Sequence, residues 1–255
     1  MAVERIMNRT ASALVKRAAR EFPAVVLTGP RQAGKTTLLR QLFGATHKYV
    51  SLDAPDLRAA ATADPRTFLE LHSAPIILDE IQNAPVLLHY IKEAIDADRH
   101  KRGRYLLTGS QNLALTQNVA ESLAGRAAML RLMPLSAREL AHDPTRKLIW
   151  EQSAHQRKAT RSESDGRLLT GTALWKQAVR GWFPEIATQP KRDGALWMSS
   201  YAQTYLERDV RALRQVGDLA QFQAFVRVLA SRSGQLLNMA DVSRDLGIAL
   251  NTVKI

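Results

Sequence analysis

Hydrophobic and polar positions alternate in two rhythms along the first part of the chain. Longer segments with apolar residues at helical spacing predict helices at residues 10–20, 37–43 and 87–97. Short apolar runs between them predict buried strands at residues 24–28, 49–52, 76–78, 105–108 and 128–132. Strands that alternate with helices are typical of an α/β fold, so we predict a mostly parallel central sheet covered by helices.

The second part of the chain has a different pattern. Residues 172–180 and 196–213 have helical spacing, and no strand is obvious there. A polar and charged stretch at residues 153–166 separates the two patterns and is typical of an exposed connection. We therefore predict an α/β domain at residues 1–150, a polar linker at residues 151–170 and an all-α region at residues 171–255.

Residues 234–255 have the spacing of a partial winged helix or helix-turn-helix. Asn238 is expected to cap the first helix, Gly247 to make the turn, and Ile248 and Val253 to anchor the core. Ala249 stands where a Ser or Thr cap of the second helix is usual. Because the chain stops about one turn into that helix, we expect a truncated product without a complete recognition helix.

A phosphate-binding motif follows the first predicted strand. Residues 29–36 fit the pattern GxxxxGK[ST] in every required position, with a strand before and a helix after. Glycines let backbone N–H groups approach phosphate oxygens, Lys35 would neutralise charge on the β- and γ-phosphates, and the Thr36 hydroxyl would ligate Mg²⁺. The predicted nucleotide-binding residues are Gly29, Pro30, Arg31, Gln32, Ala33, Gly34, Lys35, Thr36 and Thr37.

An acid pair follows the third predicted strand. Asp79 comes directly after the apolar run 76–78, where a carboxylate can contact Mg²⁺ or its waters, so Thr36 and Asp79 are the predicted metal residues. The adjacent Glu80 can polarise the attacking water. The alternative interpretation is that the pair has only a structural role, as an ordinary strand end followed by an acid that caps a helix.

Two further residues are candidates for contact with the γ-phosphate. Ser110 follows the strand at residues 105–108 as the second residue of a Gly-Ser pair, at the position where a sensor of the γ-phosphate would lie. The alternative is that the Gly-Ser pair forms an ordinary turn. Arg126 precedes the last strand and could stabilise charge on the γ-phosphate, from its own or a neighbouring subunit. An exposed salt bridge is at least as good an interpretation of Arg126.

Composition limits the function classes. The chain has no cysteine, which excludes disulfides and thiolate metal sites, and no apolar run of the roughly eighteen residues that a membrane span needs. We therefore expect a cytoplasmic protein.

The formal net charge of +12 favours polyanionic partners, of which nucleic acid is the first candidate. The compact basic cluster at residues 99–104 is either a solvated loop or a nucleic-acid contact.

Several motifs together resemble a prokaryotic AAA-superfamily family of ATP-binding proteins. They are GPRQAGKTT at residues 29–37, LDEIQ at 78–82, LLTGSQN at 106–112, SLAGR at 122–126 and PLSARE at 134–139, with YLERDV at 205–210 and SRSGQLLN at 231–238 similar to the family's uncharacterised C-terminal region. The resemblance implies ATP as the nucleotide, homo-oligomerisation, and the strand order of ATPases whose catalytic Glu follows the Mg²⁺-binding Asp. It also implies a further nuclease-like region after the helix-turn-helix.

The leading interpretation is a Mg²⁺-dependent ATP hydrolase that couples turnover to a conformational change in its helical part, with DNA as a candidate partner. The first alternative is a nucleotide-dependent switch or DNA-binding regulator with little turnover. A small-molecule kinase is the second alternative, although the acid pair favours water as the phosphate acceptor.

Overall fold

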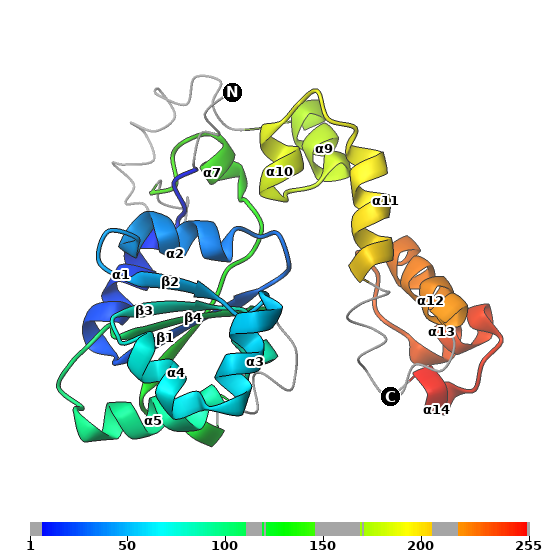
Figure 1. Cartoon of the computed structure of the whole chain (residues 1–255). Helices are drawn as coiled ribbons and strands as arrows, with labels where there is room; N and C mark the ends of the chain where they lie inside the picture. The colour runs from blue at the N-terminus through cyan, green and yellow to red at the C-terminus, as the bar shows by residue number, and fades with distance from the viewer. Residues whose placement is uncertain are drawn as a thin grey trace. The chain divides into compact units, whose positions relative to one another are not determined.

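The computed structural model describes residues 7–110, 119, 121–145, 169, 171–205 and 219–253. Its described strands form one five-stranded parallel sheet in the order β2-β3-β4-β1-β5 (Figure 1). The strands are β1 (Ala24–Gly29), β2 (Lys48–Ser51), β3 (Ile76–Asp79), β4 (Tyr105–Ser110) and β5 (Ala127–Arg131). The predicted α/β fold is confirmed, and each strand lies within two residues of its predicted range.

Helices cover both faces of the sheet because the strands bury side chains on both sides. One face packs against α1 (Ser12–Glu21) and α2 (Lys35–Phe43), with Val25 and Leu27 of β1 in its core. The other face packs against α3 (Pro55–Ala63), α4 (Pro65–Leu71) and α5 (Leu87–Ala97), with Ala24 and Val26 in its core. This alternation fixes which strand residues point toward which helices.

The topological feature that builds the site is the position of β4 between β1 and β3. Because parallel strands end at the same edge, the carboxyl ends of these three strands bring Gly29, Asp79 and Ser110 to one edge. Gly29 is the register partner of Ser110. β4 thus lies between the strand that leads into the loop and the strand that ends in Asp79.

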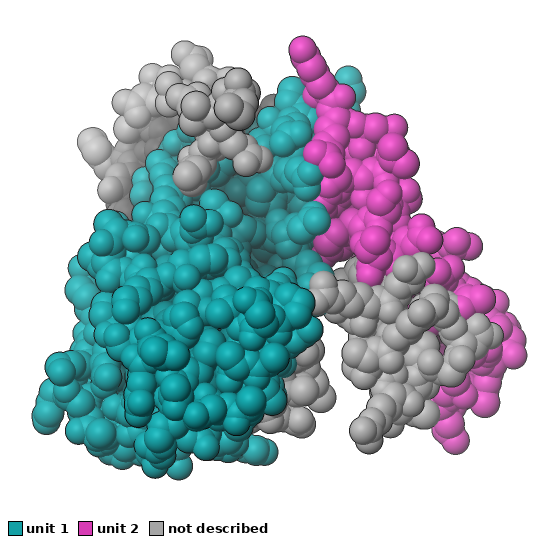
Figure 2. Space-filling model, viewed as in Figure 1, with its two compact units in different colours: residues 1–190 teal, residues 191–255 magenta. Residues whose placement is uncertain are grey.

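The chain divides into two compact units, residues 1–190 and residues 191–255 (Figure 2). The first includes α7 (Ala137–Leu140), α9 (Gly171–Arg180) and α10 (Pro184–Thr188), and Leu135 N–H donates to Trp182 O at 2.8 Å. The sequence predicted a boundary nearer residue 150. Its polar linker at residues 151–170 lies outside the described residues apart from Leu169, so those boundaries stay predictions.

The described part of the second unit is helical, as predicted. It contains α11 (Gly194–Tyr205), α12 (Leu219–Ser231), α13 (Met239–Leu246) and α14 (Leu250–Val253). Asn238 caps α13 by accepting from the Ala240 and Asp241 N–H groups, and Gly247 turns the chain with a φ of 64°. The predicted helix continuation at residues 206–213 lies outside the described residues, and so does the YLERDV motif apart from its first residue, Tyr205.

Among the described helices, none has both the length and the apolar content needed to cross a bilayer.

Candidate active site

The phosphate-binding loop connects the buried strand β1 to the first turn of α2. Gly29 has a φ of 146°, and a Cβ there would lie 2.1 Å from Leu132 O, so only glycine fits beside the end of β5. Gly34 has a φ of 90° and precedes α2 without any side-chain cap hydrogen bond. The helix thus directs its first N–H groups, and the positive end of its dipole, toward the loop.

Lys35 is a buried cation inside this loop, with 5% of its surface exposed. Its Nζ donates to Gly29 O at 3.1 Å and to Pro30 O at 2.9 Å. The loop backbone therefore holds the ammonium group close to the turn where anionic oxygens would bind.

Asp79 receives hydroxyl hydrogen bonds from three different elements. Its Oδ1 accepts from Thr36 Oγ1 at 2.7 Å and from Thr108 Oγ1 at 2.5 Å, and its Oδ2 accepts from Tyr49 OH at 3.0 Å. The carboxylate is 7% exposed and lies at the end of β3. The structure therefore joins the two predicted metal residues, Thr36 and Asp79, by a direct hydrogen bond.

Glu80 has a backbone conformation that non-glycine residues rarely adopt, with φ 57° and ψ 50°. Thr108 supports this conformation because its Oγ1 accepts from the Glu80 N–H at 3.1 Å. The Glu80 side chain accepts from Gln82 Nε2. Residues in such strained conformations concentrate at functional sites, which suits the predicted role of Glu80.

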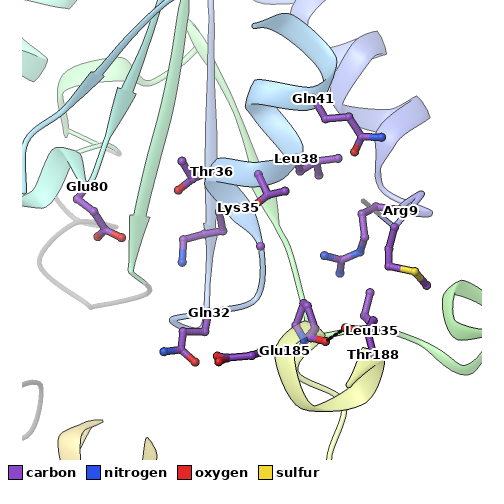
Figure 3. Close-up of a pocket in the computed structure, with 14 residues that line it drawn as sticks. Arg9, Gln32, Lys35, Thr36, Leu38, Gln41, Glu80, Leu135, Glu185 and Thr188 are labelled. Atoms are coloured by element: carbon purple, nitrogen blue, oxygen red, sulfur yellow. Dashed lines mark hydrogen bonds between the residues drawn. The ribbon is translucent and has the colours of Figure 1, made fainter. Parts of the chain in front are cut away.

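Part of the predicted set lines a cavity of about 350 Å³, namely Gln32, Gly34, Lys35, Thr36, Thr37 and Glu80, whereas Asp79 and Ser110 are not among the lining residues. Figure 3 shows side chains from the loop and α2 on one side and from α10 and the segment at Leu135 on the other. The rest of the lining is supplied by residues that the sequence analysis did not assign: Met7, Arg9, Leu38, Gln41, Leu135, Pro184, Glu185 and Thr188.

Arg9 holds the loop from the outside. It is 7% exposed, and its Nη1 donates to Ala33 O at 2.8 Å. Its Nη2 donates to Met133 O at 2.6 Å, and its Nε forms an ion pair with Glu139 Oε1 at 3.1 Å. A single buried guanidinium thus connects the phosphate loop, the segment after β5 and the start of α7.

Glu139 completes this buried pair and caps α7. Burial by itself would raise the pKa of Glu139, but hydrogen bonds from the Ser136 and Thr10 N–H groups, together with Arg9, lower the pKa below its ordinary value. Because the folded-state pKa is lowered, the ionised carboxylate stabilises the fold above its unfolded-state pKa of about 4.3.

This stabilisation is expected to disappear as the pH falls through the lowered pKa of Glu139. The difference in Tm between the wild type and Glu139→Gln should be largest at neutral pH and should shrink below about pH 4.3. Thermal unfolding followed by circular dichroism between pH 7 and pH 3 measures it. A difference that stays constant over this range would show that the carboxylate charge does not contribute.

Ser110 and Arg126 lie at opposite ends of the sheet. Ser110 is buried beside Gly29 at the edge that carries the loop, which suits its predicted role. Arg126 precedes Ala127, the partner of Ala24 at the start of β1, and five residues of strand span roughly 17 Å. Within one chain Arg126 is therefore remote from the loop, and a contribution to a neighbouring subunit stays a prediction.

The alternative interpretation of Arg126 as a salt bridge has direct geometric support. Its Nε and Nη2 contact Asp96 Oδ1 and Oδ2 at 2.7 and 2.8 Å. The Arg126 hydrogen bond is the main cause that lowers the pKa of Asp96. In the nearby basic cluster, Arg99 pairs with Asp96 and Lys101 pairs with Asp98, both at 2.8 Å. These acids reduce the local positive charge of the cluster.

The sequence analysis missed Arg9, Tyr49 and Thr108. Thr108 had a usable signal, because a hydroxyl residue interrupts the apolar strand two positions before Ser110. Arg9 had none, since its ion-pair partner lies 130 positions away.

No group of three or more His, Cys, Asp or Glu side chains suited to a metal occurs in the described ranges. A metal bound here would depend on Asp79, the Thr36 hydroxyl, substrate oxygens and water.

Comparisons with known proteins agree with this geometry. Residues 21–141 match a family described as an AAA domain, and residues 171–255 match a domain of unknown function. Two uncharacterized proteins, from Mycobacterium tuberculosis and Mycobacterium bovis, are each 32% identical over 250 residues, which cover 98% of this chain and 50% of theirs. The chain thus spans about half the length of these curated relatives.

A solved structure shares the fold. The Walker-type ATPase of Pyrococcus abyssi aligns with a TM-score of 0.51 and 14% identity, covering 99% of this chain and 97% of that chain. The AAA-domain match is confined to residues 21–141, and the solved structure shows that the chain shares its fold. The comparisons give no function to the C-terminal region, so a DNA-binding role for its helix-turn-helix pattern stays a prediction.

Proposed function

We propose that the protein binds ATP with Mg²⁺ and hydrolyses it, and that the chemistry takes place between the phosphate loop and the ends of β3 and β4. The observation that carries the proposal is the 2.7 Å hydrogen bond between Thr36 and Asp79. This bond holds the Thr36 hydroxyl beside the buried carboxylate of Asp79, so that both side chains could ligate one Mg²⁺ ion together with phosphate oxygens.

The chain's own residues have distinct roles in this proposal. The N–H groups of the loop and of the first turn of α2 bind phosphate oxygens, and Lys35 neutralises their charge. Thr36 and Asp79 would hold the Mg²⁺ ion, which when bound would neutralise charge that develops on the phosphates. Glu80 accepts a proton from the attacking water, and Ser110 contacts the γ-phosphate.

The far end of the cavity is proposed to receive the base. Met7, Leu135 and Pro184 give this end an apolar lining, while Gln41 and Thr188 offer polar groups. Because this lining includes α10, bound nucleotide would contact a helix outside the sheet and its covering layers. We infer that turnover changes the conformation of this helical part, as the leading interpretation requires.

The proposal is tested first by nucleotide binding. Lys35→Ala removes a charge-assisted interaction with phosphate, which is worth about 1.5–3 kcal/mol, so ATP affinity should fall about 10- to 100-fold. Equilibrium titration with a fluorescent ATP analogue measures this change, and competition with GTP measures base preference. Lys16→Ala on the exposed side of α1 is the matched control. Unchanged affinity in Lys35→Ala would contradict the proposed phosphate site.

Steady-state phosphate release with and without duplex DNA tests the second half of the proposal. Release that DNA stimulates would connect turnover to the formal charge of +12. Tight binding of ATP without release by the wild type would instead favour the nucleotide-dependent switch. Transfer of the γ-phosphate to a metabolite, without release in its absence, would favour the kinase.

A further inference from the structure

Tyr49 is a side chain of the acid site that the proposed mechanism does not use. It lies on β2, where its register partner is Ile77, two residues before Asp79 on the same face of β3. From this position its hydroxyl donates to Asp79 Oδ2 at 3.0 Å. The edge strand β2 thus contributes a polar contact to a site otherwise built from β1, β3, β4 and α2.

The two oxygens of Asp79 have different partners. Oδ1 accepts from Thr36 and Thr108, whereas the described hydrogen bond to Oδ2 comes from Tyr49. A carboxylate with donors on both oxygens cannot rotate about its terminal bond without breaking at least one of them. Thr36 also has a proposed role toward Mg²⁺, so Tyr49 and Thr108 are the donors dedicated to orienting the acid.

Arg40 holds the ring of Tyr49 from the neighbouring helix α2. Its guanidinium carbon lies 4.8 Å from the ring centroid, within the range of a cation–π contact. The ring is 39% exposed, so burial alone does not fix its position. The contact with Arg40 and the hydrogen bond to Asp79 together define where the hydroxyl points.

We propose that Tyr49 is a positioning residue that sets the affinity of the nucleotide-loaded site for Mg²⁺. Its hydroxyl keeps the Asp79 carboxylate turned so that the ion or its waters meet a fixed oxygen. Partners of metal ligands act in this way in other sites, where their removal weakens metal affinity about 10- to 100-fold. This inference rests on the proposed function.

The chain offers a matched pair of variants for the test. Tyr49→Phe removes one hydroxyl and leaves the ring against Arg40. Tyr90→Phe makes the same chemical change on α5, where the Arg66 guanidinium lies 5.5 Å from the ring centroid. Thermal unfolding of both variants checks that the fold is retained.

The main readout is Mn²⁺ binding to ADP-loaded protein, followed by electron paramagnetic resonance, with Mg²⁺ as competitor. Tyr49→Phe should weaken Mn²⁺ and Mg²⁺ binding about 10- to 100-fold, while Tyr90→Phe should match the wild type. ADP affinity in EDTA should stay unchanged in both variants, because the phosphate loop is intact. This metal-free affinity separates a lost orientation of Asp79 from general damage to the site.

Each other result counts against the inference. Equal Mn²⁺ affinity in Tyr49→Phe and the wild type overturns it, and so does an equal loss in Tyr90→Phe. A fall in metal-free ADP affinity in Tyr49→Phe assigns Tyr49 a structural role instead. Failure of the wild type itself to bind ADP overturns the proposed function, which distinguishes that failure from failure of the role of Tyr49.

Discussion

Replacing Glu80 with glutamine is expected to lower phosphate release from ATP about 10²- to 10⁴-fold while ATP affinity stays within about twofold of the wild type. The expected loss follows from chemistry, because an amide cannot accept the proton of the attacking water. The expected retention follows from the structure, because the Glu80 backbone is held by Thr108 and its side chain contacts Gln82 rather than the phosphate loop.

The measurement compares initial rates of phosphate release at saturating ATP with equilibrium binding of a fluorescent analogue. Glu93→Gln is the control, because Glu93 makes an exposed ion pair with Arg66 on the surface. If Glu80→Gln releases phosphate at the wild-type rate, Glu80 is not the base. Loss of release together with loss of binding would indicate damage to the site rather than removal of a catalytic group.

Removing Arg9 is expected to lower the stability of the fold more than any of the other substitutions proposed above. Arg9→Ala leaves Glu139 charged and buried without its cationic partner, and removes the donors of Ala33 O and Met133 O. Breaking a buried ion pair from one side costs about 3–5 kcal/mol. The free energy of unfolding of the first unit should fall by this amount, because the contacts of Arg9 lie within residues 9–139 of that unit.

Urea unfolding followed by far-ultraviolet circular dichroism measures the effect. Arg17→Ala is the matched control, because Arg17 lies exposed on α1 and its removal is expected to change stability by less than about 0.5 kcal/mol. Arg9→Lys should fall between the two, because one ammonium group keeps the charge but cannot reproduce the planar fork of donors. Equal stability of Arg9→Ala and Arg17→Ala would show that the buried pair contributes nothing net.

The local pattern of the chain determined the elements and the chemistry of their ends. Apolar runs such as residues 24–28 and 76–78 predicted β1 and β3 because a strand buried on both faces needs continuous apolar residues. The loop motif and the Asp79–Glu80 pair could also be predicted, because each is a short segment whose function depends on residues that are neighbours in the sequence. The turn at Gly247 was likewise predicted from local conformational preference.

What only the tertiary structure decided is which distant residues meet at this site. The sequence alone gave no means to pair Arg9 with Glu139, to bring Tyr49 of β2 to Asp79, or to place Arg126 at the far end of the sheet. The physical reason is that these contacts depend on strand order and register, which the core of the whole domain fixes. The chain itself determined the reactive groups, and packing determined their surroundings.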